Sequence, residues 1–468
     1  MRTERDSMGE MSVPDDALYG ASTQRAVLNF PISGHTMPEG FIRGLGLVKL
    51  ACARANEDLG LLPPEKSRAI QRIAREISDG QLSAHFPVDV FQTGSGTSTN
   101  MNANEVIAQR ARRLARDDAS LPALHPNDDV NLGQSSNDII PTTLHVSVAV
   151  ALQQNLLPSL IELAGALDRK AAEFDAIVKI GRTHLMDATP LTLGQEFSGY
   201  TAQTRKAIRR VEHAISLMSE LAIGGTAVGT GINCHPEFPA RVCRILSDET
   251  GIAFVEAPNH FEAQAARDDA VAVAGELAAI SASLIKIAND IRLLGSGPRA
   301  GLGELRLPAT QPGSSIMPGK VNPVMSEMLV QVGFYVQGLS STVVQCGNAG
   351  HFELNVTIPL IAHCLHESIA CLANGARVFS EKCVAGLEAD AERCSELVRR
   401  SLMLVTALNP YIGYDKAAAV AKEALKTGRT LREIVLEQKL MDAATLDRAL
   451  DPRQMTQRGG TVPGMGGG

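Results

Sequence analysis

The sequence of 468 residues lacks the patterns that mark several common classes of protein. Its eight cysteines form no Cys-x-x-Cys pair, which argues against a zinc cluster or a redox dithiol. The net charge of −7 argues against a nucleic-acid surface, because such a surface needs a basic patch or stripe. Neither a cluster of metal ligands nor a nucleotide-binding loop occurs, so we expect no metal and no organic cofactor.

Signals for targeting and for membranes are also absent. The N-terminus does not resemble a signal peptide, so we predict a cytoplasmic protein whose thiols stay reduced in the core. The stretches 139–161 and 328–352 carry no charged residue and could be mistaken for membrane spans. Both contain frequent Thr, Ser, Gln, Asn or Gly, which favours buried helices of a bundle over helices that face lipid.

Strand signals are sparse, and long helical patterns take their place. We expect strands only near the N-terminus and around 178–181 and 223–232. Ala- and Leu-rich helical segments are predicted at about 142–176, 194–222, 262–294 and 323–345, with a further helix after 353–355. In the third of these segments, apolar residues recur at a heptad spacing: Leu277, Ile280, Leu284, Ile287, Ile291 and Leu294. The chain is therefore predicted to be mainly α-helical.

The composition predicts three domains, at 1–134, 135–391 and 392–468. Charged helices replace Ala-rich ones after about residue 391, and the tail at 459–468 has too much glycine to order itself. A helix of about thirty residues spans roughly 45 Å at 1.5 Å per residue, which exceeds what a compact domain needs. We therefore expect the long helices of the central domain to pack against one another and against copies of the chain.

Residues 313–322 read Gly-Ser-Ser-Ile-Met-Pro-Gly-Lys-Val-Asn and form the most informative segment. Two glycines and a proline predict a loop. The loop offers two hydroxyls at Ser314 and Ser315, an ammonium at Lys320 and a carboxamide at Asn322, together with backbone N–H groups beside its glycines. Such a loop can surround a carboxylate, so we interpret it as an anion site rather than a plain surface turn.

This loop resembles the signature loop of the fumarase/aspartase superfamily and, in detail, that of class II fumarases. Further segments share the resemblance: 4–10, 93–97, 125–128, 181–184, 224–231 and 405–410. The resemblance implies a mainly α, three-domain fold whose central bundle of long helices forms the core of a homotetramer. It also implies the reversible anti addition of water to fumarate, which gives (S)-malate in the tricarboxylic acid cycle, at active sites drawn from three chains.

Removing water from malate requires a base, an acid and donors for an extra negative charge. The resemblance assigns the base to Ser315, which takes the carbon-bound proton and leaves an aci-carboxylate. It assigns the acid to His184, with Glu327 as its carboxylate partner, and a histidine is suited to proton exchange near neutral pH. In this scheme Lys320 and Asn322 stabilise the aci-carboxylate.

The remaining motifs supply mostly neutral donors for a dicarboxylate. By resemblance, the substrate contacts are Ser95, Gly96, Thr97, Ser135, Ser136, Asn137, Thr183, Ile316, Lys320, Val321 and Asn322. The cluster at 135–137 precedes a predicted helix, where hydroxyls and free N–H groups suit an anion and also cap the helix. A secondary anion site is implied at His125, Pro126, Asn127 and Asp128. We treat it as a binding site and not a catalytic one, because Asp128 would itself repel a carboxylate.

Two alternatives remain open. Aspartate ammonia-lyase shares the fold, the loop and the elimination chemistry but releases ammonia. The turn at 93–97 and the position of His184 after Arg-Thr favour water, whereas 324–327 is partly aspartase-like. A non-catalytic structural protein on the same fold, as lens crystallins resemble argininosuccinate lyase, would not need to keep a base, an acid and an anion loop together. We therefore predict a small dicarboxylate as the partner, with no nucleic acid and no membrane.

Overall fold

The computed structural model describes residues 1–116, 118 and 121–457. The chain divides into two compact units. Unit 1 comprises Met1–Leu160, Ala207–Ala282 and Gln331–Gly375, and unit 2 comprises Ile161–Lys206, Ser283–Val330 and Ala376–Gly468. The predicted domain boundaries at 134 and 391 stay a prediction, and the predicted flexible tail at 459–468 lies outside the described residues.

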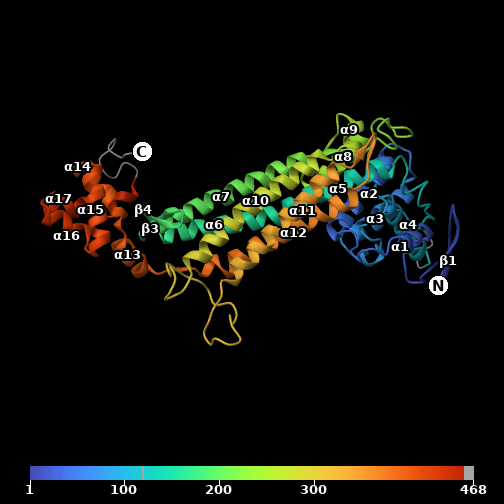
Figure 1. Cartoon of the computed structure of the whole chain (residues 1–468). Helices are drawn as coiled ribbons and strands as arrows, with labels where there is room; N and C mark the ends of the chain where they lie inside the picture. The colour runs from blue at the N-terminus through green and yellow to red at the C-terminus, as the bar shows by residue number, and fades with distance from the viewer. Residues whose placement is uncertain (117, 119–120, 458–468) are drawn as a thin grey trace. The chain divides into compact units, whose positions relative to one another are not determined.

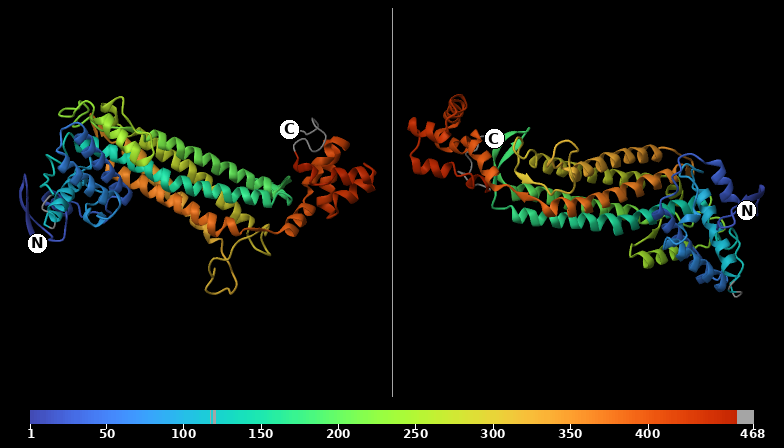
Figure 2. Two further views of the ribbon diagram at one scale, coloured as in Figure 1. Left: turned by 180° about the vertical axis from the view of Figure 1, so that it is seen from behind. Right: turned by 90° about the horizontal axis from the view of Figure 1, so that it is seen from below.

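Helices dominate the chain, which confirms the predicted mainly α fold (Figure 1). The long helices are α5 (Ser136–Ala151), which continues through a π-helical turn (Leu152–Leu156) into α6 (Leu157–Glu173), α7 (Leu193–Leu217), α10 (Asp268–Leu294), α11 (Val324–Gly347) and α12 (Ile358–Lys382). Within each unit, the parts of these helices that belong to it run side by side, as Figures 1 and 2 show. The other helices of unit 1 are α1 (Ala21–Asn29), α2 (Glu39–Asp58), α3 (Pro64–Ser78), α4 (Thr97–Leu114), α8 (Phe238–Thr250), α9 (His260–Ala265) and the 3-10 turn Ser83–His85.

The predicted heptad seam of α10 is buried, as an apolar stripe on a bundle helix should be. Its six apolar residues, Leu277, Ile280, Leu284, Ile287, Ile291 and Leu294, are at most 5% exposed. The predicted helix over 262–294 differs in one respect, since it is interrupted at residues 266–267. Asn259 caps the short helix α9 through its side-chain oxygen, Ala266 is extended, and α10 begins anew at Asp268.

The strands of the described chain are short and form two-stranded pairs. They are β1 (Arg2–Asp6) with β2 (Gly9–Val13), β3 (Val178–Thr183) with β4 (Met186–Thr192), β5 (Glu220–Leu221) with β6 (Val255–Glu256), β7 (Leu305–Arg306) with β10 (Glu388–Ala389), and β8 (Gly350–His351) with β9 (Leu354–Asn355). The predicted strands near the N-terminus and at 178–181 are confirmed.

The predicted strand at 223–232 is wrong, because this segment consists of turns and bends. Gly224 and Gly229 have φ values of 95° and 100°, which lie outside the extended region of ordinary strands. The backbone N–H groups of Gly224 and Thr226 donate to the Asp138 carboxylate at 3.1 and 3.0 Å. A buried acid, distant in sequence, thus takes the donors that a neighbouring strand would have needed.

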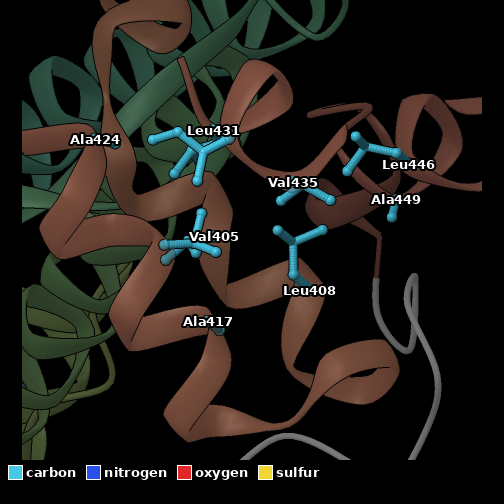
Figure 3. Close-up of a cluster of buried hydrophobic side chains, with 10 residues drawn as sticks. Val405, Leu408, Ala417, Ala424, Leu431, Val435, Leu446 and Ala449 are labelled. Carbon is cyan, nitrogen blue, oxygen red and sulfur yellow. The ribbon is translucent and has the colours of Figure 1, made fainter. Parts of the chain in front are cut away.

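The C-terminal part of unit 2 has its own apolar core, shown in Figure 3. Its helices are α13 (Ala391–Arg400), α14 (Asn409–Ile412), α15 (Tyr414–Thr427), α16 (Leu431–Glu437), α17 (Ala443–Ala449) and the 3-10 turns Val384–Gly386, Leu402–Leu408 and Gln454–Thr456. Five side chains of the cluster are fully buried: Leu408, Val420, Ile434, Val435 and Leu446. Thr430 and Asp442 cap α16 and α17 through side-chain oxygens, so each short helix begins at a good capping residue.

Two helical stretches, Ser136–Glu173 and Asp268–Leu294, are long and apolar enough to cross a membrane. The core helices of soluble proteins pass the same test, and 56% and 44% of the most apolar windows are buried inside the protein. Length and composition are therefore weak evidence for membrane insertion here. The other uncharged stretch, 328–352, forms most of α11 and is not uniformly buried, because Phe334 and Tyr335 are 60% and 49% exposed.

Candidate active site

The turn at 93–97 belongs to unit 1 and is tightly packed. Gly96 has a left-handed φ of 73° and precedes α4, and a Cβ atom there would lie 2.7 Å from Ile140 of α5. A Cβ atom at Gly94 would lie 1.7 Å from the Val356 carbonyl oxygen, so only glycine fits. The Ser95 and Thr97 hydroxyls are 2.8 Å apart, and Ser95 is only 7% exposed. The two predicted contacts are therefore held in place by the backbone around them.

The segment 135–137 forms the start of α5 in the same unit. The Ser135 hydroxyl accepts a hydrogen bond from the Asn137 N–H at 3.2 Å, and the Asp138 carboxylate accepts one from the Ser135 N–H at 2.9 Å. This reciprocal arrangement is a capping box, as the sequence predicts. Burial raises the pKa of Asp138 to about 6, although its backbone N–H donors oppose that shift. The Asn137 side chain also donates to the Ala227 carbonyl at 2.8 Å.

A buried network of amide side chains is hydrogen-bonded to this helix start. The side-chain oxygen of Asn131 accepts hydrogen bonds from Lys49 Nζ at 3.0 Å, Asn100 Nδ2 at 3.2 Å and Asn104 Nδ2 at 3.3 Å. Asn100 Nδ2 also lies 3.1 Å from the Ser136 hydroxyl. The structure therefore brings the first turns of α4 and α5 together, because Asn100 of α4 and Ser136 of α5 belong to one hydrogen-bond network.

Sequence reasoning missed Lys49 and its amide partners. The signal that could have found Lys49 is a single charge inside the apolar run Gly44–Ala53 of α2, where its neighbours are mostly buried. Asn100 and Asn104 are four residues apart on one face of α4, which was a weak signal, whereas Asn131 lies in a distant turn and carries none.

The predicted secondary anion site at 125–128 is also in unit 1. The imidazole Nδ1 of His125 lies 3.1 Å from the Asp128 carboxylate and 3.0 Å from the Asp128 backbone nitrogen. His125, Asn127 and Asp128 are exposed, and Pro126 is partly buried. The acid is thus turned toward the histidine of its own segment, and the role of this segment in anion binding stays a prediction.

In unit 2, Thr183 and His184 lie at the tip of the β3–β4 hairpin. His184 and Leu185 have φ values of 57° and 62°, so both central residues of this two-residue turn are left-handed. Hairpin turns of this kind prefer Asn and Gly, and side chains such as Leu are strained in them. Thr183, His184 and Leu185 are exposed, and His184 is the only one of the eleven histidines in unit 2. The hairpin therefore presents one imidazole on a strained turn.

A buried ion cluster anchors the base of this hairpin. Arg182 binds the Glu304 carboxylate with two hydrogen bonds of 2.9 and 3.1 Å. Lys179 Nζ lies 3.5 Å from Glu304 and 3.0 Å from Glu196. Glu304 and Lys179 are 0% and 1% exposed, so these charges are almost wholly removed from water. Such a cluster is rigid while complete and costly if one member is removed.

The loop at 313–322 is closed at its ends in unit 2. The Gly313 N–H donates to the Lys320 carbonyl at 2.9 Å, and the Asn322 carboxamide donates to the Gly313 carbonyl at 2.7 Å. The Ser314 hydroxyl accepts hydrogen bonds from the backbone N–H groups of Ile316 and Met317 at 3.2 and 2.9 Å. Asn322, a predicted substrate contact, therefore uses one of its two N–H donors in a hydrogen bond within the loop.

The predicted reactive residues of this loop point outward. Ser315, Ile316, Lys320 and Val321 are exposed, with Ile316 at 83%. One side of the loop lines an open hollow of about 430 Å³ together with residues 309–312, and Lys320 and Val321 contribute to it. Glu327 lies in the first turn of α11 and is partly buried. His184, Ser315 and Glu327 thus all belong to unit 2, on a hairpin turn, a loop and a helix start.

Comparisons with known proteins agree with the resemblance described above. A family model described as lyase matches residues 9–338, and one described as fumarase C C-terminus matches residues 404–457. The chain is 54% identical over 458 residues to a class II fumarate hydratase of Halobacterium salinarum, which covers 98% of this chain and 97% of that protein. It is 49% identical over 467 residues to a class II fumarate hydratase of Xylella fastidiosa, covering 100% of this chain and 98% of that protein. The crystal structure of class II fumarase from Schistosoma mansoni superposes with a TM-score of 0.94 at 40% identity, covering 97% of this chain and 99% of that one.

Proposed function

Because the chain belongs to the class II fumarate hydratase family and is a hydro-lyase, we propose that it catalyses the reversible anti addition of water to fumarate to give (S)-malate. The observation that carries this proposal is the loop at 313–322, whose ends are joined by hydrogen bonds and which exposes both Ser315 and Lys320. The substrate is a C4 dicarboxylate, and the proposed place of the reaction is the tricarboxylic acid cycle in the cytoplasm. All eight cysteines are free, which is compatible with a reducing compartment.

In the direction from malate to fumarate, Ser315 first loses its hydroxyl proton to solvent as the loop closes, and Lys320 and the loop N–H groups stabilise the alkoxide. The alkoxide takes the proton from the carbon next to one carboxylate and becomes a neutral hydroxyl. The electrons of the broken C–H bond pass into that carboxylate and make it an aci-carboxylate. Lys320, the free donor of Asn322 and the loop N–H groups bind this form more tightly than the ground state, which lowers the barrier. A serine hydroxyl in water is too weak an acid for this role. We therefore propose that the exposed loop closes over the substrate and excludes water before Ser315 reacts.

His184 then completes the reaction by protonating the departing hydroxyl, directly or through a water molecule, so that it leaves as water. Glu327 acts as its carboxylate partner and stabilises the imidazolium. In the reverse direction the same pair removes a proton from the attacking water. The left-handed turn sets the backbone position of His184, while the Arg182–Glu304 pair anchors the hairpin that carries it.

The second carboxylate of the substrate is bound by the donors of unit 1. These are the hydroxyls of Ser95, Thr97, Ser135 and Ser136, the Asn137 carboxamide and the free N–H groups at the start of α5. Thr183 is a further proposed contact, and the segment His125–Asp128 is a proposed secondary anion site. No metal and no organic cofactor is needed for the steps described.

We further propose that the protein is a homotetramer whose active sites combine residues from three chains. Large apolar side chains are exposed on α11, with Phe334 at 60% and Tyr335 at 49%, and burial against copies would remove them from water. Sedimentation would give the mass of a tetramer, and a fully active monomer would contradict this part of the proposal.

The reaction itself is tested by the loss of fumarate's ultraviolet absorbance with purified protein, once in plain buffer and once with excess ammonium. Absorbance should fall in plain buffer, and the product should be (S)-malate. The second candidate is aspartate ammonia-lyase, which the partly aspartase-like segment 324–327 favours. Consumption of fumarate only when ammonium is present would replace the hydratase with this enzyme.

A further inference from the structure

Lys49 is a buried cation whose side-chain contacts, in the part of the chain that the structure describes, are with neutral amides. It lies in the middle of α2 and is 1% exposed. Its ammonium contacts the side-chain oxygens of Asn131 and Gln134, both at 3.0 Å, and both of these are neutral amides. Among the residues that the structure describes, no carboxylate forms an ion pair with it. A buried lysine is almost always paired with an acid, because an isolated charge is costly in the protein interior.

Asp138 is the carboxyl group that acts electrostatically on Lys49, but its oxygens are engaged elsewhere. They accept hydrogen bonds from the backbone N–H groups of Ser135, Gly224 and Thr226, at 2.9, 3.1 and 3.0 Å. Burial lowers the pKa of Lys49 to about 8, which still leaves most of it protonated at neutral pH. Unit 1 therefore holds a positive charge that none of its described side chains neutralises by direct contact.

A short chain of contacts leads from this charge to the start of α5. Lys49 Nζ donates to Asn131 Oδ1 at 3.0 Å, Asn100 Nδ2 donates to the same oxygen at 3.2 Å, and Asn100 Nδ2 lies 3.1 Å from the Ser136 hydroxyl. Asn131 Oδ1 takes a third donor from Asn104 at 3.3 Å. An amide oxygen that accepts three donors is strongly fixed, and it fixes the orientation of Asn100 in turn.

We propose that Lys49 is a positioning residue for substrate binding, which orients Ser136 through Asn131 and Asn100 and whose unpaired charge is balanced when a dicarboxylate binds at the start of α5. The inference rests on the proposed function for the identity of the anion. The charge lies behind the helix start rather than against the substrate, so it strengthens the binding of fumarate, malate and an unreactive dicarboxylate alike. Interactions of this uniform kind change KM and leave kcat nearly unchanged.

The first test compares Lys49→Gln and Lys49→Met with Lys49→Arg. Both neutral variants should raise KM for fumarate about tenfold and leave kcat within about threefold. The reason is that a buried positive charge a few contacts away should strengthen the binding of an anion by about that factor. Lys49→Arg keeps the charge and should restore part of the affinity. The matched control is Lys170→Met, because Lys170 is also a buried lysine but is paired with Glu173, and its KM should not change.

The second measurement needs no variant and uses succinate, an unreactive dicarboxylate, as the probe. The titratable groups that act on Lys49 are Cys52 on α2 and Asp138 on α5, while α4 and the turn 131–134 present amides to it. Succinate should raise the proton affinity of Lys49. Calorimetry at pH 8 in two buffers of different ionisation enthalpy should therefore show uptake of up to about half a proton per site.

The outcomes separate this inference from the proposed function. If wild-type protein fails to hydrate fumarate but binds succinate with proton uptake and loses affinity in Lys49→Gln, the inference stands and the reaction must be reassigned. If wild type hydrates fumarate while Lys49→Gln keeps its KM, or if succinate binds without proton uptake, the inference is wrong. Should the neutral variants fail to fold, the wild-type calorimetry decides alone.

Discussion

The two groups of site residues differ in how firmly the protein holds them. In unit 1, Ser135, Ser136 and Asn137 each take part in a hydrogen bond with another described residue, and a buried network lies behind them. In unit 2, Ser315 and His184 are exposed at the tips of a loop and a turn, and the Ser315 hydroxyl has no hydrogen-bond partner in the part of the chain that the structure describes.

This difference follows from the work that each group is proposed to do. Donors that bind a carboxylate can be held in position before the substrate binds. Hydrogen bonds to other protein groups order them in advance, so binding does not have to pay that loss of entropy. A serine that acts as a base must be kept neutral in water and become basic only in a closed, dry site. We therefore expect substitutions in unit 2 to change the chemical step, and substitutions in unit 1 to change binding and stability.

The largest effect is expected for Ser315→Ala. Loss of the proposed base should lower kcat by about 10³-fold, within the usual range for general acid–base groups, while KM changes little. The side chain is exposed, so the fold should be unaffected. Initial rates of fumarate hydration measure the effect, with Ser198→Ala, an exposed serine on α7 of the same unit, as the control. A rate within a few fold of wild type would remove Ser315 from the mechanism.

The next effect is on the stability of unit 2 and comes from Glu304→Gln. This change leaves Arg182 and Lys179 without their shared carboxylate partner in the interior, which costs about 3–5 kcal/mol for a buried ion cluster. The thermal midpoint should fall sharply, and kcat should fall as the hairpin of His184 loosens. Glu396→Gln, which removes a partly exposed partner of Arg393, is the control and should change little. Equal midpoints for the two variants would contradict the anchoring role.

Sequence reasoning predicted the long helices, and two of its failures, at 223–232 and at Lys49, share one cause. The seam of α10 and the loop at 313–322 are local patterns, so spacing and residue type were enough to predict them. The turns at 223–232 were missed because their partner is Asp138, far away in the sequence. The Lys49 network was missed for the same reason, since its members lie on α2, on α4 and in a turn.

Residue roles within the loop were predicted less completely than the loop itself. Asn322 was assigned to the substrate, but one of its donors closes the loop onto the Gly313 carbonyl. A sequence pattern shows which donors are available and cannot show which of them the protein uses internally. The assignment of Ser315, His184 and Glu327 to one unit likewise required the structure.

Lowering the pH should reduce the stability of unit 1 through its buried histidines, whereas the histidine of unit 2, His184, is exposed. Burial lowers the pKa of His366 to about 4 and that of His145 to about 3, below the ordinary value of 6.5. The unfolded chain then binds more protons than the folded one between these values, so stability is lost as pH falls from about 6.5 to 4. His366→Gln should flatten the fall of the thermal midpoint over this range, whereas the exposed His351→Gln should not. An unchanged slope in His366→Gln would show that this histidine is not responsible.

A smaller effect is expected for Ser135→Ala in unit 1. Loss of the capping hydroxyl should cost about 1 kcal/mol of stability, because the Asn137 N–H loses its partner. Since the same hydroxyl is a proposed substrate contact, KM should rise severalfold while kcat stays close to that of wild type. Ser198→Ala, an exposed serine on α7, serves as the control. A fall in kcat with an unchanged KM would show that Ser135 acts in the chemical step, which would contradict the proposed difference between the two units.

The division of labour between the two units is tested most directly by complementation between variants. Ser315→Ala removes the proposed base of unit 2, and Asn137→Asp places a negative charge at the proposed binding group of unit 1, where it should repel the substrate carboxylate, so each variant alone should have little activity at low fumarate concentration. If each active site takes these residues from different chains, tetramers mixed at random from equal amounts contain about one quarter of sites with both residues intact. Co-expression of the two variants should therefore restore about a quarter of wild-type activity. Activity no greater than the average of the two parent variants would contradict the account.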